Sequence, residues 1–240
     1  MRMIGHDAIL VPYGVQNWPI ARVAEIHAGR MAGLPLAIIR PGAMLRINGG
    51  ALDLPPPAPT EAEAPTAARV AAQLKQLCGG WNGAAGRFVD RYFTFLDRQI
   101  DRHRAELDER LAPFDGLFRV EDFIHSAPLP LPRAFLFAPV TPSSSENAEP
   151  ADFMKVDFAW WLGDRMVAVL LAPSPLTPLT ARRRDERLTT AGIGLAHCTT
   201  ADLEAPELGW FDETLGPGGS RFWEGEPLPS APHPSGLPDF

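Results

Sequence analysis

Residues 154–198 read MKVDFAWWLGDRMVAVLLAPSPLTPLTARRRDERLTTAGIGLAHC, and this stretch decides the fold of the chain. Within it, residues 165–172 are an almost continuous apolar run, typical of a central strand covered on both faces. Residues 179–191 are predicted to form an arginine-rich helix that ends at Gly192, and residues 193–198 read as a further strand. Because these lengths suit a β-α-β crossover, we expect the two strands to pair in parallel.

Further segments with strand character precede this crossover. A polar excursion, residues 141–151, separates two of them, and a turn at Gly163-Asp164 leads into the central run. The predicted strands are residues 117–124, 133–139 and 154–161.

A long amphipathic helix is predicted over residues 85–111. Apolar side chains recur at steps of three and four residues, and charged side chains lie between them, over roughly seven turns. Pro113 ends the pattern. His103 falls on the apolar stripe, so we expect a packed core histidine and not a ligand.

The first part of the chain has the pattern of a small α/β lobe. Strands are expected at residues 7–11, 34–39 and 43–47, and a helix at residues 19–32. Turns are expected at Pro41-Gly42 and at Asn48-Gly49-Gly50.

Composition divides the chain further. Residues 53–65, DLPPPAPTEAEAP, are the expected linker between an N-terminal α/β lobe, residues 1–52, and a core, residues 66–225. Residues 226–240 form a Pro-rich tail, and disorder is expected in the last dozen or so residues. The four aromatic residues before that tail are expected to pack on the core: Trp210, Phe211, Phe222 and Trp223. The expected fold class is α/β, with a mixed central sheet and flanking helices.

Composition also limits the function. The chain has 240 residues, 45% of them hydrophobic, and its formal net charge is −7. A negative charge is the wrong sign for a protein that binds phosphate backbones non-specifically.

Cys78 and Cys198 lie far apart and suit neither a disulfide framework nor a zinc site, so both are expected as small buried side chains. The start of the chain lacks a secretory apolar run and no window reaches about 18 apolar residues, so a cytoplasmic location is expected. The abundance of Ala, Pro and Arg is typical of a GC-rich genome and favours a bacterial source.

Four short segments carry a resemblance to a known family: residues 156–160 (VDFAW), 163–169 (GDRMVAV), 183–188 (RRDERL) and 191–193 (AGI). With the preceding helix and hairpin, their order resembles the restriction-endonuclease-like fold of the PD-(D/E)xK nuclease superfamily. The resemblance covers about residues 85–203 and implies a nuclease-like core.

In that family, an aspartate on one strand and a (D/E)-x-K pair on the next hold a divalent metal, with carboxylate oxygens as ligands. Asp157 matches the aspartate position. On the next strand, however, the acidic position falls on Leu170 and the lysine position on Ala172, which can neither ligate a metal nor activate water. The resemblance therefore implies a lost metal site.

Two nearby residues are candidates to replace the missing members of that metal site. Glu186 lies on the following helix, and in this family a catalytic side chain can migrate to a neighbouring helix. Lys155 lies two residues before Asp157, on the same strand face. The alternative is that Asp157 is satisfied by the backbone or by an arginine, and that Glu186 is a surface charge paired with Arg182 or Arg183.

The helix predicted over residues 179–191 carries a basic cluster that consists of Arg182, Arg183, Arg184 and Arg187. Phosphate contact and a solvated helix face are the two interpretations of this cluster.

Trp160 and Trp161 point to opposite faces of a strand, so one is expected in the core and the other is a candidate for an exposed interaction residue. His197 and Cys198 also point apart and cannot act together as base and nucleophile.

The favoured hypothesis is a catalytically inactive, nuclease-like binding or scaffolding module that has a protein partner and needs no cofactor. The candidate binding residues are the arginine cluster, through which nucleic acid is also a possible partner, and Trp160 or Trp161. The alternative is an Mg²⁺-dependent nuclease or phosphodiesterase that uses Asp157 with Glu186 or Lys155. A third hypothesis is a small-ligand binder that uses the turns of the N-terminal lobe. No membrane partner is expected.

Overall fold

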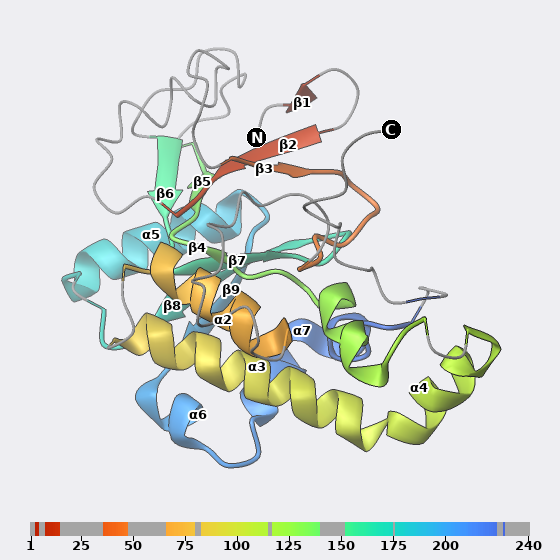
Figure 1. Cartoon of the computed structure of the whole chain (residues 1–240). Coiled ribbons are helices and arrows are strands. Elements are labelled where there is room, and N and C mark those ends of the chain that lie inside the picture. Colours follow the sequence, from red (N-terminus) through yellow and green to blue (C-terminus); the bar gives the residue numbers. More distant parts are fainter. Residues whose placement is uncertain are drawn as a thin grey trace.

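The computed structural model describes residues 3–4, 8–14, 36–47, 66–79, 83–114, 117–139, 152–174, 176–224 and 228. In Figure 1 a mixed sheet lies between a group of helices and a second group of strands. The expected α/β class with a mixed sheet is therefore confirmed. The expected helix at 19–32, the linker 53–65, the excursion 141–151 and the tail apart from Leu228 lie outside the described residues.

The central sheet is built from β4 (Leu131–Pro132), β7 (Phe158–Trp161), β8 (Met166–Leu171) and β9 (Gly194–Cys198), in that order. β7 and β8 are antiparallel, with Phe158 opposite Val169. Their turn contains Gly163 at φ +98°, which glycine adopts without a Cβ clash. β8 and β9 are parallel, with Leu170 opposite His197, so the predicted parallel pair is confirmed.

The crossover between β8 and β9 is α5 (Pro178–Thr190), within one residue of the predicted helix at each end. The Thr177 side chain accepts the backbone N–H of Thr180, and Pro178 occupies the first turn, where its missing N–H leaves no partner unsatisfied. Leu188 is the buried residue of this helix. Most of α5 therefore meets the rest of the protein through polar side chains.

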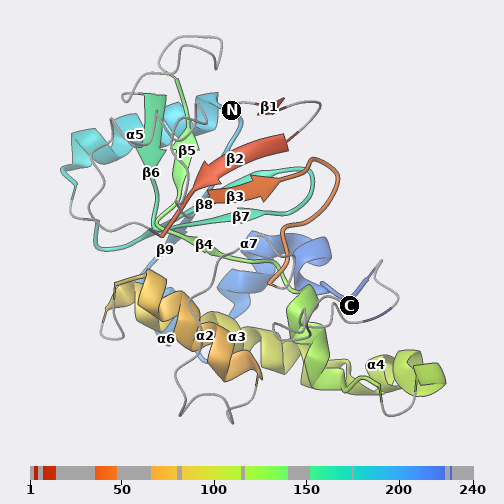
Figure 2. The same ribbon diagram turned by 45° about the horizontal axis from the view of Figure 1, so that its top comes forward.

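Helices cover one face of the central sheet. α3 (Ala84–Arg102) lies beside α2 (Thr66–Leu77) on that face in Figures 1 and 2. The Phe88 ring on α3 lies 4.4 Å from the Phe158 ring, and Tyr92 lies 5.5 Å from Trp160. After α6 (Thr200–Glu204), α7 (Gly209–Ser220) adds Phe211, whose ring is 5.5 Å from that of Phe88.

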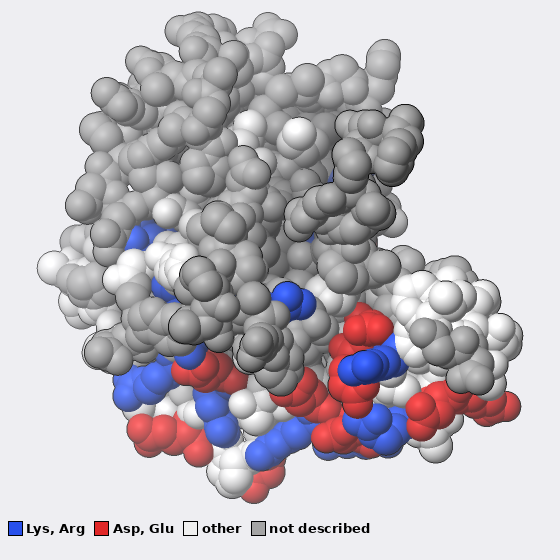
Figure 3. All heavy atoms as spheres, in the orientation of Figure 1, with Lys and Arg blue, Asp and Glu red and all other residues white. Residues whose placement is uncertain are grey.

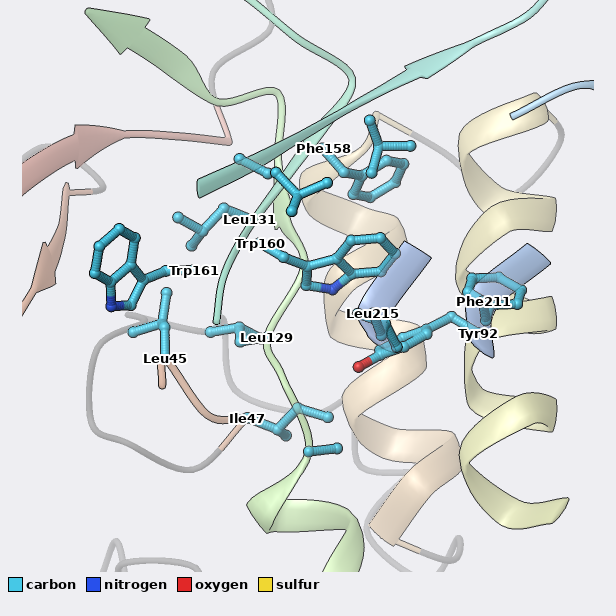
Figure 4. Close-up of a cluster of buried hydrophobic side chains, with 14 of the residues drawn as sticks. Leu45, Ile47, Tyr92, Leu129, Leu131, Phe158, Trp160, Trp161, Phe211 and Leu215 are labelled. Atoms are coloured by element: carbon cyan, nitrogen blue, oxygen red, sulfur yellow. The ribbon is translucent and has the colours of Figure 1, made fainter. Parts of the chain in front are cut away.

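Strands cover the opposite face. β1 (Met3–Ile4), β2 (Ala8–Pro12) and β3 (Leu36–Ile39) form an antiparallel sheet there. Trp161 points toward Leu45 on this side, whereas Trp160 points toward Tyr92 (Figure 4). Trp161 Nε1 donates to the carbonyl oxygens of Arg40, at 3.2 Å, and Ala43, at 2.8 Å.

The strands before the linker share a hydrophobic core with the rest of the chain. Buried side chains such as Val11 and Ile39 belong to the same contiguous cluster as Trp160 and Phe211. Backbone hydrogen bonds also cross between the two parts, since Leu45 N donates to the Trp161 carbonyl and Leu129 N to that of Leu45. The boundary at 53–65 stays a prediction, but the N-terminal strands are not a separately packed unit.

The predicted long helix is not continuous. α3 ends at Arg102, and α4 (Arg104–Leu111) begins after His103, which has φ −107° and ψ 13°. The His103 ring lies 4.9 Å from that of Trp223, so a contact with the C-terminal segment accompanies the break.

Two strand predictions are wrong. Residues 117–124 contribute to a 3-10 helix, Val120–Ser126, because Asp122 accepts the Arg119 N–H at 2.8 Å and closes a local turn. Residues 43–47 form an irregular segment whose isolated bridge joins Arg46 to Pro128.

Two other predicted strands differ in extent. Residues 133–139 give the shorter strand β5 (Phe135–Phe137), and residues 154–161 are divided at a bend into β6 (Phe153–Lys155) and β7. The aromatic residues near the C-terminal end pack as expected, since Phe211, Phe222 and Trp223 are buried and Trp210 is half-buried.

Candidate functional site

The pairing of the strands places the side chains of Asp157, Leu170 and His197 in one row and the backbone of Arg133 beside Asp157. The Arg133 N–H donates to the Asp157 carbonyl at 2.7 Å, so these residues oppose each other. Extending the β7–β8 register by one residue puts Asp157 opposite Leu170, and Leu170 lies opposite His197. Opposed residues point to the same face of a sheet. This face meets α5, because His197 Nε2 lies 3.2 Å from Asp185 Oδ2.

Asp157 is a structural acceptor in this row. Its Oδ2 atom accepts the backbone N–H of Leu171 at 2.8 Å, at the end of β8. Burial raises the pKa of the Asp157 carboxyl above its ordinary value, although the residue keeps exposed surface. The Leu171 hydrogen bond and three nearby positive charges act in the opposite direction, and those charges are Arg184, Lys155 and Arg133.

Of these cations, Lys155 ends β6 and Arg133 lies in the turn between β4 and β5. Lys155 is exposed, and Val156 beside it is buried, so Lys155 and Asp157 both point away from the core. Burial and the Arg133 charge lower the pKa of Lys155, while Asp157 opposes this change. Arg133 has φ +48°, a left-handed conformation that is uncommon outside glycine and that clusters at functional sites.

The metal ligands that the resemblance implies do not converge here. Glu186 lies on the exposed side of α5, where its Oε1 pairs with Arg182 Nε at 2.7 Å, and it is not among the charges that shift the pKa of Asp157. Within the described residues, no group of three His, Cys, Asp or Glu side chains could hold a metal ion. A single carboxylate among cations does not fit Mg²⁺, which prefers several oxygen ligands.

The predicted arginine cluster divides into different roles. Arg184 pairs with Asp185 at 3.0 Å, and its side chain is only 12% exposed. Arg187 Nε donates to the Ala138 carbonyl at 3.1 Å. Arg183 is exposed and makes no hydrogen bond or ion pair within the part of the chain that the structure describes. Arg183 is therefore the member of the cluster best placed to meet a partner.

Both tryptophans of β7 are buried, which corrects the expectation that one is exposed. Trp160 has no exposed surface, and Trp161 has 7%. The reason is that β2, β3 and the segment after them cover the face to which Trp161 points. Neither ring is available to a partner in this structure.

Both cysteines are buried and free, as expected. Burial raises the pKa of each thiol to about 12. Cys78 lies near enough to Arg133 and Asp157 for their charges to act on its pKa. A thiol with so high a pKa is protonated at neutral pH and is a poor nucleophile.

The exposed side of α5 has the features of an interaction surface. Leu179 is 60% exposed and Leu176, just before the helix, is 38% exposed. An open hollow also runs along the helix, lined by Pro178, Ala181, Arg182, Asp185, Glu186, Thr189 and Thr190. By contrast, acidic and basic side chains alternate along the lower edge of the molecule in Figure 3, where α3 and α4 lie, so that edge is not a basic nucleic-acid surface.

Sequence reasoning found Asp157, Lys155 and the arginine cluster, considered His197 only together with Cys198, and gave no site role to Arg133 or Asp185. The structure brings Asp157 and Lys155 together and leaves Glu186 outside the group. The missing signal is strand register, which aligns Arg133 and His197 with Asp157 and which no short motif encodes.

Comparison of the chain with protein-family models, curated proteins and solved structures found no match. Among the described residues, no helix is both long enough and apolar enough to cross a membrane.

Proposed function

We propose that this chain is a non-catalytic binding or scaffolding module with a nuclease-like core and a protein partner. The order of a helix, an antiparallel hairpin, a crossover helix and a parallel strand supports the likeness of the core to the PD-(D/E)xK nucleases. Fold alone does not fix function, so the proposal depends on the site.

The observation that carries the proposal is the environment of Asp157. Its carboxylate accepts the Leu171 N–H and lies among Arg184, Lys155 and Arg133. Leu170 occupies the neighbouring position where a second carboxylate would complete a metal site. These residues favour an anion over a divalent cation, and they leave Asp157 with a structural role.

The partner surface in this proposal is the exposed side of α5. Arg183, which has no partner among the residues that the structure describes, lies one helical turn after the exposed Leu179, and the exposed Leu176 precedes the helix. Exposed apolar side chains next to arginine are typical of protein interfaces, and arginine is enriched there. The chain is acidic overall, which favours a protein partner over bulk nucleic acid.

A metal-binding and cleavage experiment tests the absence of catalysis. Wild type and Asp157→Ala are titrated with Mn²⁺ by calorimetry and assayed with Mg²⁺ or Mn²⁺ on DNA and RNA. We expect no heat of binding and no cleavage above that of the buffer. Cleavage by the wild type that Asp157→Ala abolishes would establish the metal-dependent nuclease instead, with Glu186 or Lys155 completing the site.

Site-specific photocrosslinking tests the partner surface. A photoreactive amino acid replaces Leu179, and in a control chain it replaces Leu117, which is 74% exposed on a different segment. We expect a discrete crosslinked protein from position 179 that is absent at position 117 and is lost with Arg183→Glu. Equal crosslinking at the two positions, or no effect of Arg183→Glu, would remove α5 as the interface.

A further inference from the structure

Two cations near Asp157 lack a partner within the described part of the chain. Lys155 and Arg133 make no side-chain hydrogen bond or ion pair there, although each is close enough to Asp157 to act on its pKa. Elsewhere on this face the charges are neutralised in pairs, as Arg184 is by Asp185. Asp157 offsets only one of these two positive charges, so the pair keeps a net positive charge that a bound anion neutralises.

The positions of these groups suit a small anion. Arg133 and Asp157 oppose each other across two strands, and Lys155 precedes Asp157 by two residues on the outward side. Lys155 ends β6 and Asp157 lies in the bend before β7, so the two residues are neighbours along the chain, and long lysine and arginine side chains can reach one ligand between them. Arg184 on α5 also lies close enough to act on the pKa of Asp157, although its own charge is paired with Asp185.

Asp157 adds an acceptor to this group of donors. Its Oδ2 atom is occupied by the Leu171 N–H, and its Oδ1 atom has no hydrogen bond within the described residues. An ionised carboxylate can only accept hydrogen bonds, so it repels an anion that has no proton to donate. It attracts an anion that keeps one.

We infer that Lys155, Arg133 and Asp157, with Arg184 behind them, form a binding site for a phosphate group that retains a proton. The lysine and the guanidinium bind the charged oxygens, and the free Asp157 oxygen accepts the P–OH hydrogen. Inorganic phosphate carries such a proton at neutral pH, and a phosphomonoester carries one near its second pKa of about 6. Sulfate and phosphodiesters carry none, so the site discriminates against both. The inference does not depend on the protein partner proposed above.

Calorimetric titration of the full chain at about pH 6 tests the site, because monoesters are then partly protonated. The probes are inorganic phosphate, phenyl phosphate, sulfate and dimethyl phosphate at matched ionic strength. We expect inorganic phosphate to bind, and sulfate and dimethyl phosphate to bind at least about tenfold more weakly, because a charged hydrogen bond is lost. Phenyl phosphate separates two sources: binding equal to inorganic phosphate indicates a phosphorylated molecule, and weaker binding indicates the free ion.

Three variants keep the inference falsifiable. Lys155→Met removes an exposed charge and is expected to weaken phosphate binding about tenfold or more. Asp157→Asn keeps an oxygen for the Leu171 N–H and is expected to abolish the preference for phosphate over sulfate. Arg102→Met, at an exposed residue at the end of α3, is the matched control and should leave binding unchanged. Phosphate binding that is absent in the wild type, or equal in wild type and Lys155→Met, would overturn the inference, as would a preference that survives Asp157→Asn.

Discussion

Replacement of Asp157 separates its structural role from a catalytic one. Its carboxylate Oδ2 atom accepts the Leu171 N–H at 2.8 Å and so closes the end of β8 against β7. Asp157→Ala removes the acceptor and leaves that N–H without its protein partner, whereas Asp157→Asn keeps a carbonyl oxygen in the same place. The two variants are therefore expected to differ in stability, although both remove the charge.

The size of the difference follows from the hydrogen bond and from its exposure. A hydrogen bond to a charged group contributes about 1.5–3 kcal/mol when buried. Asp157 keeps exposed surface, so water replaces part of this contribution, and we expect Asp157→Ala to lower the free energy of unfolding by about 1 kcal/mol. Asp157→Asn should remain within about 0.5 kcal/mol of the wild type, as for a surface change.

The pH dependence has a definite sign. Burial raises the folded-state pKa of Asp157 above its ordinary value of 3.8, so the unfolded chain ionises more readily than the folded protein. The wild type therefore loses stability as the pH rises from about 3.8 through the folded-state pKa. Asp157→Asn cannot ionise. Its free energy of unfolding, relative to the wild type, should therefore be most favourable at neutral pH and decline as the pH falls to about 3.8.

Urea unfolding measures these differences. The proteins compared are the wild type, Asp157→Ala, Asp157→Asn and, as a control at an exposed turn residue, Asp164→Ala. The control should stay within about 0.5 kcal/mol of the wild type. If Asp157→Asn is as unstable as Asp157→Ala at neutral pH, the charge matters and not the acceptor, and the structural reasoning fails.

Further predictions follow from buried groups. Phe88→Ala removes a fully buried ring that contacts several others and should cost about 3–5 kcal/mol in urea unfolding, against less than about 0.5 kcal/mol for the exposed Leu179→Ala; near-equal losses would contradict the packing. Burial lowers the pKa of His125 below 6.5, so stability should fall as the pH drops below about 6.5, and His125→Leu should flatten that slope in urea midpoints at successive pH values. With thiol pKa values of about 12, Cys78 and Cys198 should react with Ellman's reagent at pH about 8 only after unfolding; rapid reaction of the native protein would refute their burial.

The elements that could be predicted from sequence are those with one dominant local signal. The apolar run of β8, the capped helix α5 and the following β9 each carry their own pattern, and Gly163 and Gly192 mark turns that need positive φ. Their parallel pairing follows from segment lengths and the handedness of crossovers.

Distant contacts decided the features that sequence did not predict. The helix predicted over residues 85–111 breaks at His103, where its ring meets that of Trp223, more than a hundred residues away. One of Trp160 and Trp161 was expected to face solvent, because the strand pattern alone cannot show that the segment containing Arg40 and Ala43 lies against Trp161. Hydrophobic periodicity reports which side of an element is apolar but not what lies against it.

The candidate site shows why a motif position is weak evidence for chemistry. An aspartate where the family holds its metal is compatible with catalysis and with a backbone hydrogen bond, and the surrounding charges decide between them. At an effective dielectric of about 20 and a separation of about 6 Å, a divalent ion and one guanidinium repel by about 5 kcal/mol, less where water and salt screen them. Asp157 supplies one negative charge against the two charges of Lys155 and Arg133, while Arg184 is itself paired with Asp185. The same excess of positive charge that disfavours a metal favours an anion, and Leu170, opposite Asp157, adds no carboxylate that would offset it.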